Sequence, residues 1–121
     1  MDHEKYMRLA LIEAKKAAAA GEIPVGAVVV CGNTVLAAAR NDREVTHSPL
    51  GHAEVRAIEM ACQARGDWRL DNCTLYVTLE PCPMCSGAII NSRIKRVVYG
   101  AADTKAGCCG SVADLFAMPF N

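Results

Sequence analysis

The fold is decided by one stretch, Thr74-Leu75-Tyr76-Val77-Thr78-Leu79-Glu80-Pro81-Cys82-Pro83-Met84-Cys85. Its first part, residues 74–79, is rich in β-branched and aromatic side chains, which is typical of a strand. Glu80-Pro81 ends that strand, and Pro83 suits the first turn of a helix that we expect to reach about Ser92. The stretch therefore predicts a strand that runs directly into a helix, with two cysteines at the junction.

Further elements are expected on both sides of this stretch. Upstream they are a helix over residues 4–20, strands over 25–31 and 34–40 joined at Gly32-Asn33, a loop over 41–51 and a helix over 52–64. Downstream they are a strand over 95–100 and a short helix near 112–116. This order predicts an α/β fold, a three-layer α/β/α sandwich with a mixed central sheet.

Length and composition exclude several classes of protein. A chain of 121 residues, 52% apolar and 21% charged, predicts one globular domain over residues 1–121. Thirteen basic and thirteen acidic side chains exclude a wholesale cationic grip on nucleic acid but leave room for a local basic patch. The longest strongly apolar run, residues 25–31, is far shorter than the roughly 20 residues that span a bilayer. Because the amino terminus also has no signal-peptide pattern, we expect a cytoplasmic protein without a membrane partner.

Seven cysteines are unusual for such a chain. An odd number without a secretion signal argues against a disulfide framework, because the cytosol keeps thiols reduced. Cys31, Cys62 and Cys73 lie in apolar periodic stretches, and we expect them to pack as small hydrophobic side chains. Cys82 and Cys85 differ, because they share a helix start.

Cys82, Cys85 and His52 form a candidate metal site. Two cysteines three residues apart at a helix start project from one face, and the positive end of the helix lowers the pKa of thiols there. His52 opens the preceding helix and can bring a ring nitrogen to the same place. Two thiolates and one imidazole suit Zn²⁺ and disfavour Mg²⁺ or Ca²⁺, which prefer oxygen ligands.

Three ligands rather than four indicate a catalytic zinc site, because one tetrahedral position stays open for water. Cys108-Cys109 cannot supply a second Cys-x-x-Cys pair, since the two residues are adjacent. Glu54 can act as a general base if its side chain curls back from the first turn of the helix. Taken alone, His-x-Glu is common on surfaces and Cys-x-x-Cys could be a redox pair, but the two motifs together favour zinc.

The combined signature resembles that of the zinc-dependent nucleoside and nucleobase deaminases. Longer stretches resemble the bacterial tRNA-specific adenosine deaminases of that superfamily, and the likeness runs from the first helix to the last residue. These stretches are Glu22-Ile23-Pro24-Val25-Gly26-Ala27-Val28, the opening stretch from Thr74 to Cys85, Ser92-Arg93-Ile94, Val97-Val98-Tyr99-Gly100-Ala101 and Lys105-Ala106-Gly107.

This resemblance implies a cytidine-deaminase-like fold, a homodimer and one Zn²⁺ per chain. It makes His52, Cys82 and Cys85 the zinc ligands, and Glu54 the proton shuttle in the hydrolytic deamination of adenosine to inosine. The implied substrate is the wobble adenosine of a tRNA anticodon stem-loop, because single-stranded bases can be splayed out into a pocket.

Three further residues are implied to bind the substrate. Asn41 occupies the base-contacting position of the family, although it could equally be an ordinary turn asparagine. Asp103 matches a position near the nucleotides that flank the target. Lys105 belongs to the only local cationic concentration, which also includes Arg93, Lys95 and Arg96 and predicts a phosphate contact. Residues 93–96 could instead be a solvated strand entry.

The chain departs from the family in three places. Pro49-Leu50-Gly51 replaces the usual Pro-Thr-Ala, so we expect Gly51 to loosen the backbone before the zinc helix and Leu50 to alter the pocket rim. Cys108-Cys109 replaces two small residues, and we expect both thiols to pack. The family continues past the asparagine that matches Asn121 with a strand and a helix. We therefore expect a short carboxyl terminus and an apolar last strand that lacks a second neighbour.

The sequence is also compatible with two other functions. A deaminase of a free base or nucleoside, such as guanine or cytidine, would not need a cationic rim. A truncated, non-catalytic zinc-binding domain would bind zinc and dimerise without turnover.

Overall fold

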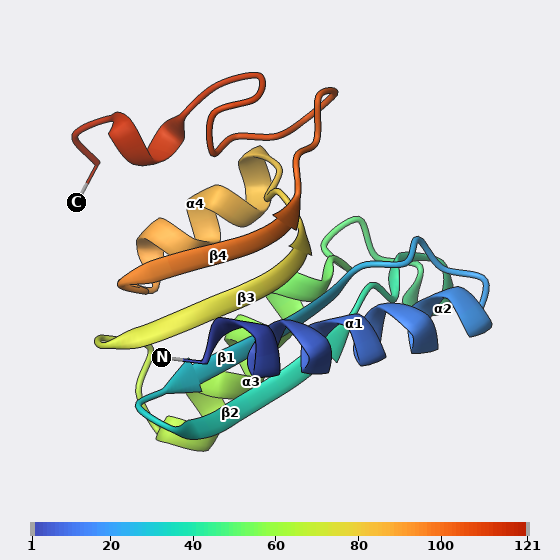
Figure 1. The fold of residues 1–121 in the computed structure, drawn as a ribbon, viewed down its shortest axis with the longest axis horizontal. Coiled ribbons are helices and arrows are strands. Elements are labelled where there is room, and N and C mark those ends of the chain that lie inside the picture. Colours follow the sequence, from blue (N-terminus) through green and yellow to red (C-terminus); the bar gives the residue numbers. More distant parts are fainter. Residues whose placement is uncertain (1, 121) are drawn as a thin grey trace.

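A computed structural model describes residues 2–120, and Figure 1 shows how their helices and strands are arranged. In chain order these are α1 (His3–Ala19), β1 (Gly26–Cys31), β2 (Thr34–Arg40), α2 (Arg43–Thr46), α3 (Ala53–Arg65), β3 (Cys73–Leu79), α4 (Pro83–Asn91), β4 (Arg96–Ala101) and the 3₁₀ helix η1 (Leu115–Ala117). The predicted strands and the three long helices are present within one residue of their expected bounds. None of the helices of residues 2–120 is both long and apolar enough to cross a membrane.

The strands form one mixed sheet in the order β2-β1-β3-β4. β1 pairs antiparallel with both neighbours, so that Val28 lies opposite Ala38 of β2 and Tyr76 of β3. β3 and β4 are parallel, and the chain must therefore cross over between them through α4. This crossover places the start of α4 at the carboxyl end of β3 and confirms the mixed sheet.

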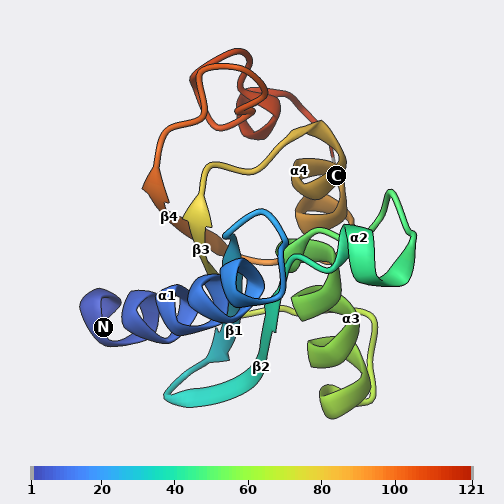
Figure 2. The same ribbon diagram turned by 90° about the vertical axis from the view of Figure 1, so that its right-hand side faces the viewer.

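Helices cover both faces of the sheet (Figure 2). Successive residues of a strand point to opposite faces. Val28 packs with Tyr6 of α1, whereas Val29 packs in a second cluster with Ala57 of α3 and Ile89 of α4. Because both faces are covered, β1 is buried almost throughout, which explains its continuous apolar sequence. The predicted three-layer α/β/α sandwich is confirmed.

Residues 41–51 contain the short helix α2, where the sequence predicts only a loop. The buried carboxylate of Glu22 accepts the backbone N–H groups of Glu44 and Val45, 3.0 and 2.8 Å away. Such donors in the first turn of a helix are usually capped by a neighbouring side chain. Here the cap comes from a residue far upstream, so no local pattern reveals it.

The last short helix begins later than expected, because η1 covers Leu115–Ala117 instead of residues 112–116. The N–H groups of Val112 and Ala113 donate to the carbonyl of Gly107, which holds both residues in a turn. The side chain of Asp114 then accepts the N–H of Phe116 and caps the helix start.

β4 is an outer strand of the sheet, and within residues 2–120 it pairs only with β3. Its apolar side chains are partly uncovered, and Tyr99 is 38% exposed. The expectation of an apolar last strand with a single neighbour is therefore confirmed for the described part of the chain.

Candidate active site

The starts of α3 and α4 meet near the carboxyl end of β3 (Figure 1). His52 is the N-cap of α3 and Cys82 is the N-cap of α4, and both have extended backbone conformations. Pro83 follows as the first helical residue, as predicted, and Cys85 lies within the same turn. His52 and Cys82 each stand at the amino-terminal end of a helix. Because these two helix ends lie side by side, the side chains of both caps come close to each other.

The side chains of His52, Cys82 and Cys85 converge. Their candidate ligand atoms, one imidazole nitrogen and two sulfurs, all lie within 4.8 Å of one another. The Nδ1 atom of His52 is 3.6 Å from Sγ of Cys82 and 3.4 Å from Sγ of Cys85. A tetrahedral site with Zn–S bonds of about 2.3 Å and a Zn–N bond of about 2.0 Å would separate these atoms by about 3.5 Å. The donor types and their spacing therefore fit zinc.

The two thiols of the cluster differ in acidity. A hydrogen bond from the Cys85 thiol is the main cause that lowers the pKa of Cys82 to about 5, and backbone N–H groups of the helix start add to it. The same hydrogen bond, together with burial, raises the pKa of Cys85. The predicted effect of the helix start is therefore present at Cys82 alone, and Cys85 has to lose its proton when a metal binds.

Glu54 lies in the first turn of α3 and is only 4% exposed. Burial raises the pKa of its carboxyl group above the ordinary value. Glu54 and His52 line the same cavity, although residues i and i+2 of a helix point apart. They can do so because His52, as an extended N-cap, is not yet part of the helix. A buried carboxyl group in this position can accept a proton and return it.

A cavity of about 160 Å³ opens onto the cluster. Its lining residues come from separate parts of the chain and are Ile23, Val25, Asn41, Arg43, His52, Glu54, Leu79, Glu80, Cys82, Asp103 and Ala106. Pockets for drug-sized ligands usually enclose roughly 300–1,000 Å³. The smaller cavity suits a single planar base rather than a whole nucleotide.

Two of the three residues expected to bind substrate line this cavity. Asn41 is buried, and its Oδ1 accepts the N–H of Arg43, so it also forms the turn that the alternative interpretation expects. Asp103 reaches the cavity from the loop after β4, where its Oδ1 accepts the N–H of Lys105. Lys105 is exposed and is not among the lining residues.

The cationic concentration predicted from the sequence is divided in the structure. Arg93 and Lys95 precede β4, whereas Lys105 lies beyond its end. A strand of this length separates the two groups by roughly 20 Å. The Arg93 guanidinium instead lies over the ring of the exposed Trp68, 5.5 Å from its centroid. The predicted cationic concentration is therefore divided between the two ends of β4, with Lys105 on the side of the cavity, and its contact with phosphate stays a prediction.

The entry to α3 is tighter than expected. Gly51 is buried, and a Cβ atom there would lie 2.5 Å from Oδ1 of Asp42 and 2.7 Å from Cα of Arg43. Glycine therefore allows a close approach of two segments, and the expectation that Gly51 loosens the backbone is wrong. Leu50 is 53% exposed and does not line the cavity, so the expected change of the pocket rim is absent too.

Glu80, where the sequence indicates only the end of a strand, is buried. Its carboxylate accepts the backbone N–H groups of Asp103, Cys109 and Ser111 and the hydroxyl of Ser111. The Ser111 hydroxyl is the main cause that lowers the pKa of Glu80 to about 2, so the carboxylate stays ionised. The only sign of this role in the sequence is a charged residue directly after an apolar strand. A charge that is buried there needs hydrogen-bond partners.

The remaining cysteines pack as expected. Cys73 and Cys108 are buried, whereas Cys31, Cys62 and Cys109 are half-buried, and all seven thiols of the chain are free. The described residues therefore contain no disulfide.

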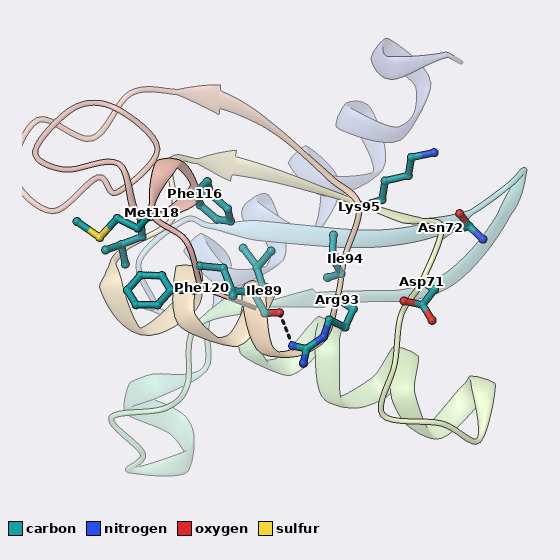
Figure 3. A pocket seen from close by; sticks show the side chains of 11 residues that line it. Asp71, Asn72, Ile89, Arg93, Ile94, Lys95, Phe116, Met118 and Phe120 are labelled. Atoms are coloured by element: carbon teal, nitrogen blue, oxygen red, sulfur yellow. Dashed lines mark hydrogen bonds between the residues drawn. The ribbon is translucent and has the colours of Figure 1, made fainter.

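A larger cavity, of about 590 Å³, lies at the other end of α4 (Figure 3). Ile89, Phe116 and Phe120 form its apolar part, and Arg93 and Lys95 contribute its basic groups. None of the lining residues belongs to the His-Cys-Cys cluster. The candidate chemistry therefore belongs to the smaller cavity.

Comparisons with known proteins agree with this geometry. The family model for MafB19-like deaminases matches residues 1–120. A curated relative, the tRNA-specific adenosine deaminase of Bacillus subtilis, is 52% identical over 112 residues, which cover 93% of this chain and 70% of the relative.

Solved structures of deaminases are similar to this chain as well. One from a study of A-to-I editing by tRNA:A34 deaminases at the wobble position is 44% identical, with a TM-score of 0.93 over 96% of this chain and 84% of the other. A guanine deaminase from Bacillus subtilis is 42% identical, with a TM-score of 0.83 over 86% of this chain and 67% of the other. The chain therefore belongs to the MafB19-like deaminase family and, within it, to the tRNA-specific adenosine deaminases.

Proposed function

We propose that this chain forms one zinc-dependent deaminase domain that converts adenosine to inosine at the wobble position of a tRNA anticodon. The observation that carries the proposal is the convergence of His52, Cys82 and Cys85 with the buried Glu54 at one base-sized cavity. The names of the relatives, tRNA-specific adenosine deaminases, indicate that the substrate is an adenosine in tRNA.

His52, Cys82 and Cys85 would hold one Zn²⁺ per chain, through Nδ1 and the two sulfurs. The tetrahedral spacing of these three atoms supports this ligand set. When bound, the zinc ion supplies Lewis-acid activation of water. Because both sulfur ligands would be thiolates, their two negative charges would balance the two positive charges of the ion.

Glu54 moves the protons of the reaction. Its carboxylate accepts a proton from the attacking water and delivers it to N1 of the adenine ring. It then accepts the second proton of that water, from the new hydroxyl group at C6, and passes it to the departing amine. The reaction consumes one water molecule and releases ammonia, and the adenosine becomes inosine within the RNA. The burial that raises the pKa of Glu54 helps the carboxyl group to hold a proton between these steps.

The cavity accepts a base that has left its stack, as a splayed nucleotide of an anticodon loop does. Asn41 lines the cavity and contacts the base, and Asp103 lies where the flanking nucleotides enter. Lys105, exposed on the same loop, contacts a phosphate. On a chain with zero formal net charge, such local contacts have to provide the attraction to RNA.

The enzyme is a cytoplasmic homodimer in this proposal. Exposed apolar side chains that line the larger cavity, such as Phe120 and Met118, form a surface that a second chain would cover (Figure 3). Seven free thiols suit a reducing compartment. Sedimentation equilibrium of the zinc-loaded protein tests the assembly: a species of twice the chain mass supports it, and a monomer at micromolar concentration contradicts it.

The activity is tested with three substrates on one zinc-loaded sample. An anticodon stem-loop with adenosine at the wobble position, free guanine and free cytidine are incubated separately, and Glu54→Ala serves as the control. Inosine formed in the RNA by the wild-type protein alone supports the proposal. Turnover of a free base or nucleoside without inosine in the RNA would contradict it.

Guanine deamination is the second candidate, because the solved guanine deaminase shares the fold at 42% identity. The higher identity to the tRNA enzyme, 52%, favours RNA as the substrate. A protein that holds stoichiometric zinc and converts none of the three substrates would be a non-catalytic zinc-binding domain.

A further inference from the structure

Glu80 stands directly after β3 and two residues before the N-cap of α4, yet its partners belong to a distant loop. We call this segment, residues 103–111, the wall loop. Oε1 of Glu80 accepts the N–H of Asp103 at 3.1 Å and the hydroxyl of Ser111. Oε2 accepts the N–H groups of Cys109 and Ser111 at 2.9 and 3.1 Å. Both oxygens of the carboxylate are therefore engaged by the two ends of one loop.

The wall loop is fitted closely around this carboxylate. A Cβ atom on Gly107 would lie 2.5 Å from Oε2 of Glu80 and 2.5 Å from the carbonyl oxygen of Asp103. Glycine is thus required at this position because a side chain would not fit, and not because the backbone has a positive φ. This close approach is independent of the hydrogen bonds and leads to the same conclusion, that the loop is built on Glu80.

The wall loop also forms one side of the base cavity. Asp103 and Ala106 line the cavity together with His52 and Glu54. The latter two belong to the metal-binding part of the site, which is formed by the starts of α3 and α4. Hydrogen bonds to a charged acceptor are among the stronger ones in proteins. The position of this wall therefore depends on a carboxylate that belongs neither to the metal cluster nor to the proton shuttle.

We propose that Glu80 is a positioning residue of the deaminase site, which holds the wall loop and with it Asp103 and Ala106 in the conformation that receives the base. The inference rests on the proposed function, because it concerns the cavity of that reaction. Glu80 acts through the loop and transfers no proton. Its removal should leave the metal-binding part intact and reduce the fraction of molecules whose cavity is ready for substrate.

A smaller ready fraction weakens apparent binding in proportion, whereas the complex that does form reacts normally. Replacement of Glu80 should therefore raise KM and leave kcat nearly unchanged. A residue that only stabilises the fold would lower the melting temperature and leave KM unaffected at temperatures where the variant is folded. The split between KM and kcat separates the two roles.

The test uses the zinc-loaded wild-type protein and the variants Glu80→Gln and Ser111→Ala. For Glu80→Gln we expect KM for the anticodon stem-loop to rise about tenfold or more and kcat to stay within about threefold. Amide hydrogen exchange at Cys109 and Ser111 should accelerate, and the zinc content should be unchanged. Ser111→Ala removes one donor and keeps the carboxylate, so its shift should have the same direction and be smaller. If Glu80→Gln does not fold, the same measurements on Ser111→Ala test the proposal.

Glu22→Gln is the matched control for the exchange measurement. Glu22 is also a buried glutamate that caps backbone N–H groups, but its partners Glu44 and Val45 belong to α2. This variant should leave exchange at Cys109 and Ser111 at the wild-type rate. Acceleration there would indicate general loosening of the protein and would overturn the specific role of Glu80.

The inference and the proposed function fail in different ways. If the wild-type protein deaminates free guanine and not the stem-loop, the proposed function fails and KM is measured with guanine. Unchanged exchange of the wall loop in Glu80→Gln, or an unchanged KM for whichever substrate is converted, overturns the role of Glu80. A fall in kcat with constant KM also overturns it, because that result would place Glu80 in the chemical step.

Discussion

The base cavity has two parts that are built in different ways. The metal-binding part comes from two helix starts, and its residues His52, Cys82 and Cys85 lie within two short motifs. The wall loop is held by Glu80, whose partners lie 23 to 31 residues further along the chain. The first part can be recognised in the sequence, whereas the second exists only through contacts between distant residues.

This difference predicts two kinds of response to substitution. A ligand of a three-residue metal site has no substitute, so its loss should be all-or-none. The wall loop is held by several hydrogen bonds and by close packing, so its loss should be graded. Substitutions in the two parts should therefore differ both in size and in the kinetic constant that they change.

The largest effect is expected for Cys82→Ala in the metal-binding part. The variant should lose stoichiometric zinc and measurable deamination, and it should unfold at a markedly lower temperature, because the metal joins two helix starts. Zinc content measured by atomic absorption and thermal unfolding of the same sample check this. Full retention of zinc would show that the ligand set is wrong.

Glu54→Gln should affect chemistry without affecting the metal. Loss of the proton shuttle should lower kcat by about 10²–10⁴-fold, the usual contribution of general acid–base catalysis. Zinc content and the melting temperature should stay close to wild type, because Glu54 is not a ligand. Loss of zinc in this variant would contradict the separation of roles within the metal-binding part.

Gly107→Ala should affect the wall loop with an intermediate size. The added methyl group displaces either Glu80 or the backbone of Asp103, at a cost of about 1–3 kcal/mol in the free energy of unfolding. KM should rise while zinc stays bound. Gly87→Ala in α4 is the control, because its Cβ would meet no atom within 4 Å, and it should be neutral or slightly stabilising. Equal effects of the two substitutions would contradict the close fit of the wall loop.

Lys105→Ala should give the smallest effect, at the rim of the cavity. Removal of one exposed phosphate contact should raise KM a few-fold and reduce the slope of log KM against log salt concentration by about 0.7–1. Titration of KM between low and moderate salt measures this slope. A slope identical to wild type would remove Lys105 from the RNA-binding surface.

The same contrast explains what the sequence could predict. The strands and long helices follow from local periodicity. The convergence of His52 with the Cys-x-x-Cys pair follows from two motifs that each open a helix. The sequence does not reveal the helix α2, because its cap, Glu22, lies far upstream. Nor does it reveal the role of Gly51, because the side chain of Asp42, against which Gly51 packs, approaches only in the folded chain.

The division of the basic residues has a similar cause. Arg93 and Lys105 are close in sequence, but an intervening strand carries them to opposite ends of the sheet. Sequence proximity predicts spatial proximity only when no extended element lies between two residues. The predicted strand over residues 95–100 is such an element, and it lies between Arg93 and Lys105.

Inosine formation in an anticodon stem-loop, with zinc measured on the same enzyme sample, decides whether the proposed reaction takes place. The proposed function requires about one zinc ion per chain and inosine at the wobble position, with no conversion of adenosines elsewhere in the loop and a rate lowered by about 10²–10⁴-fold in Glu54→Gln. Stoichiometric zinc without inosine, or inosine formed equally well by Glu54→Gln, would contradict it.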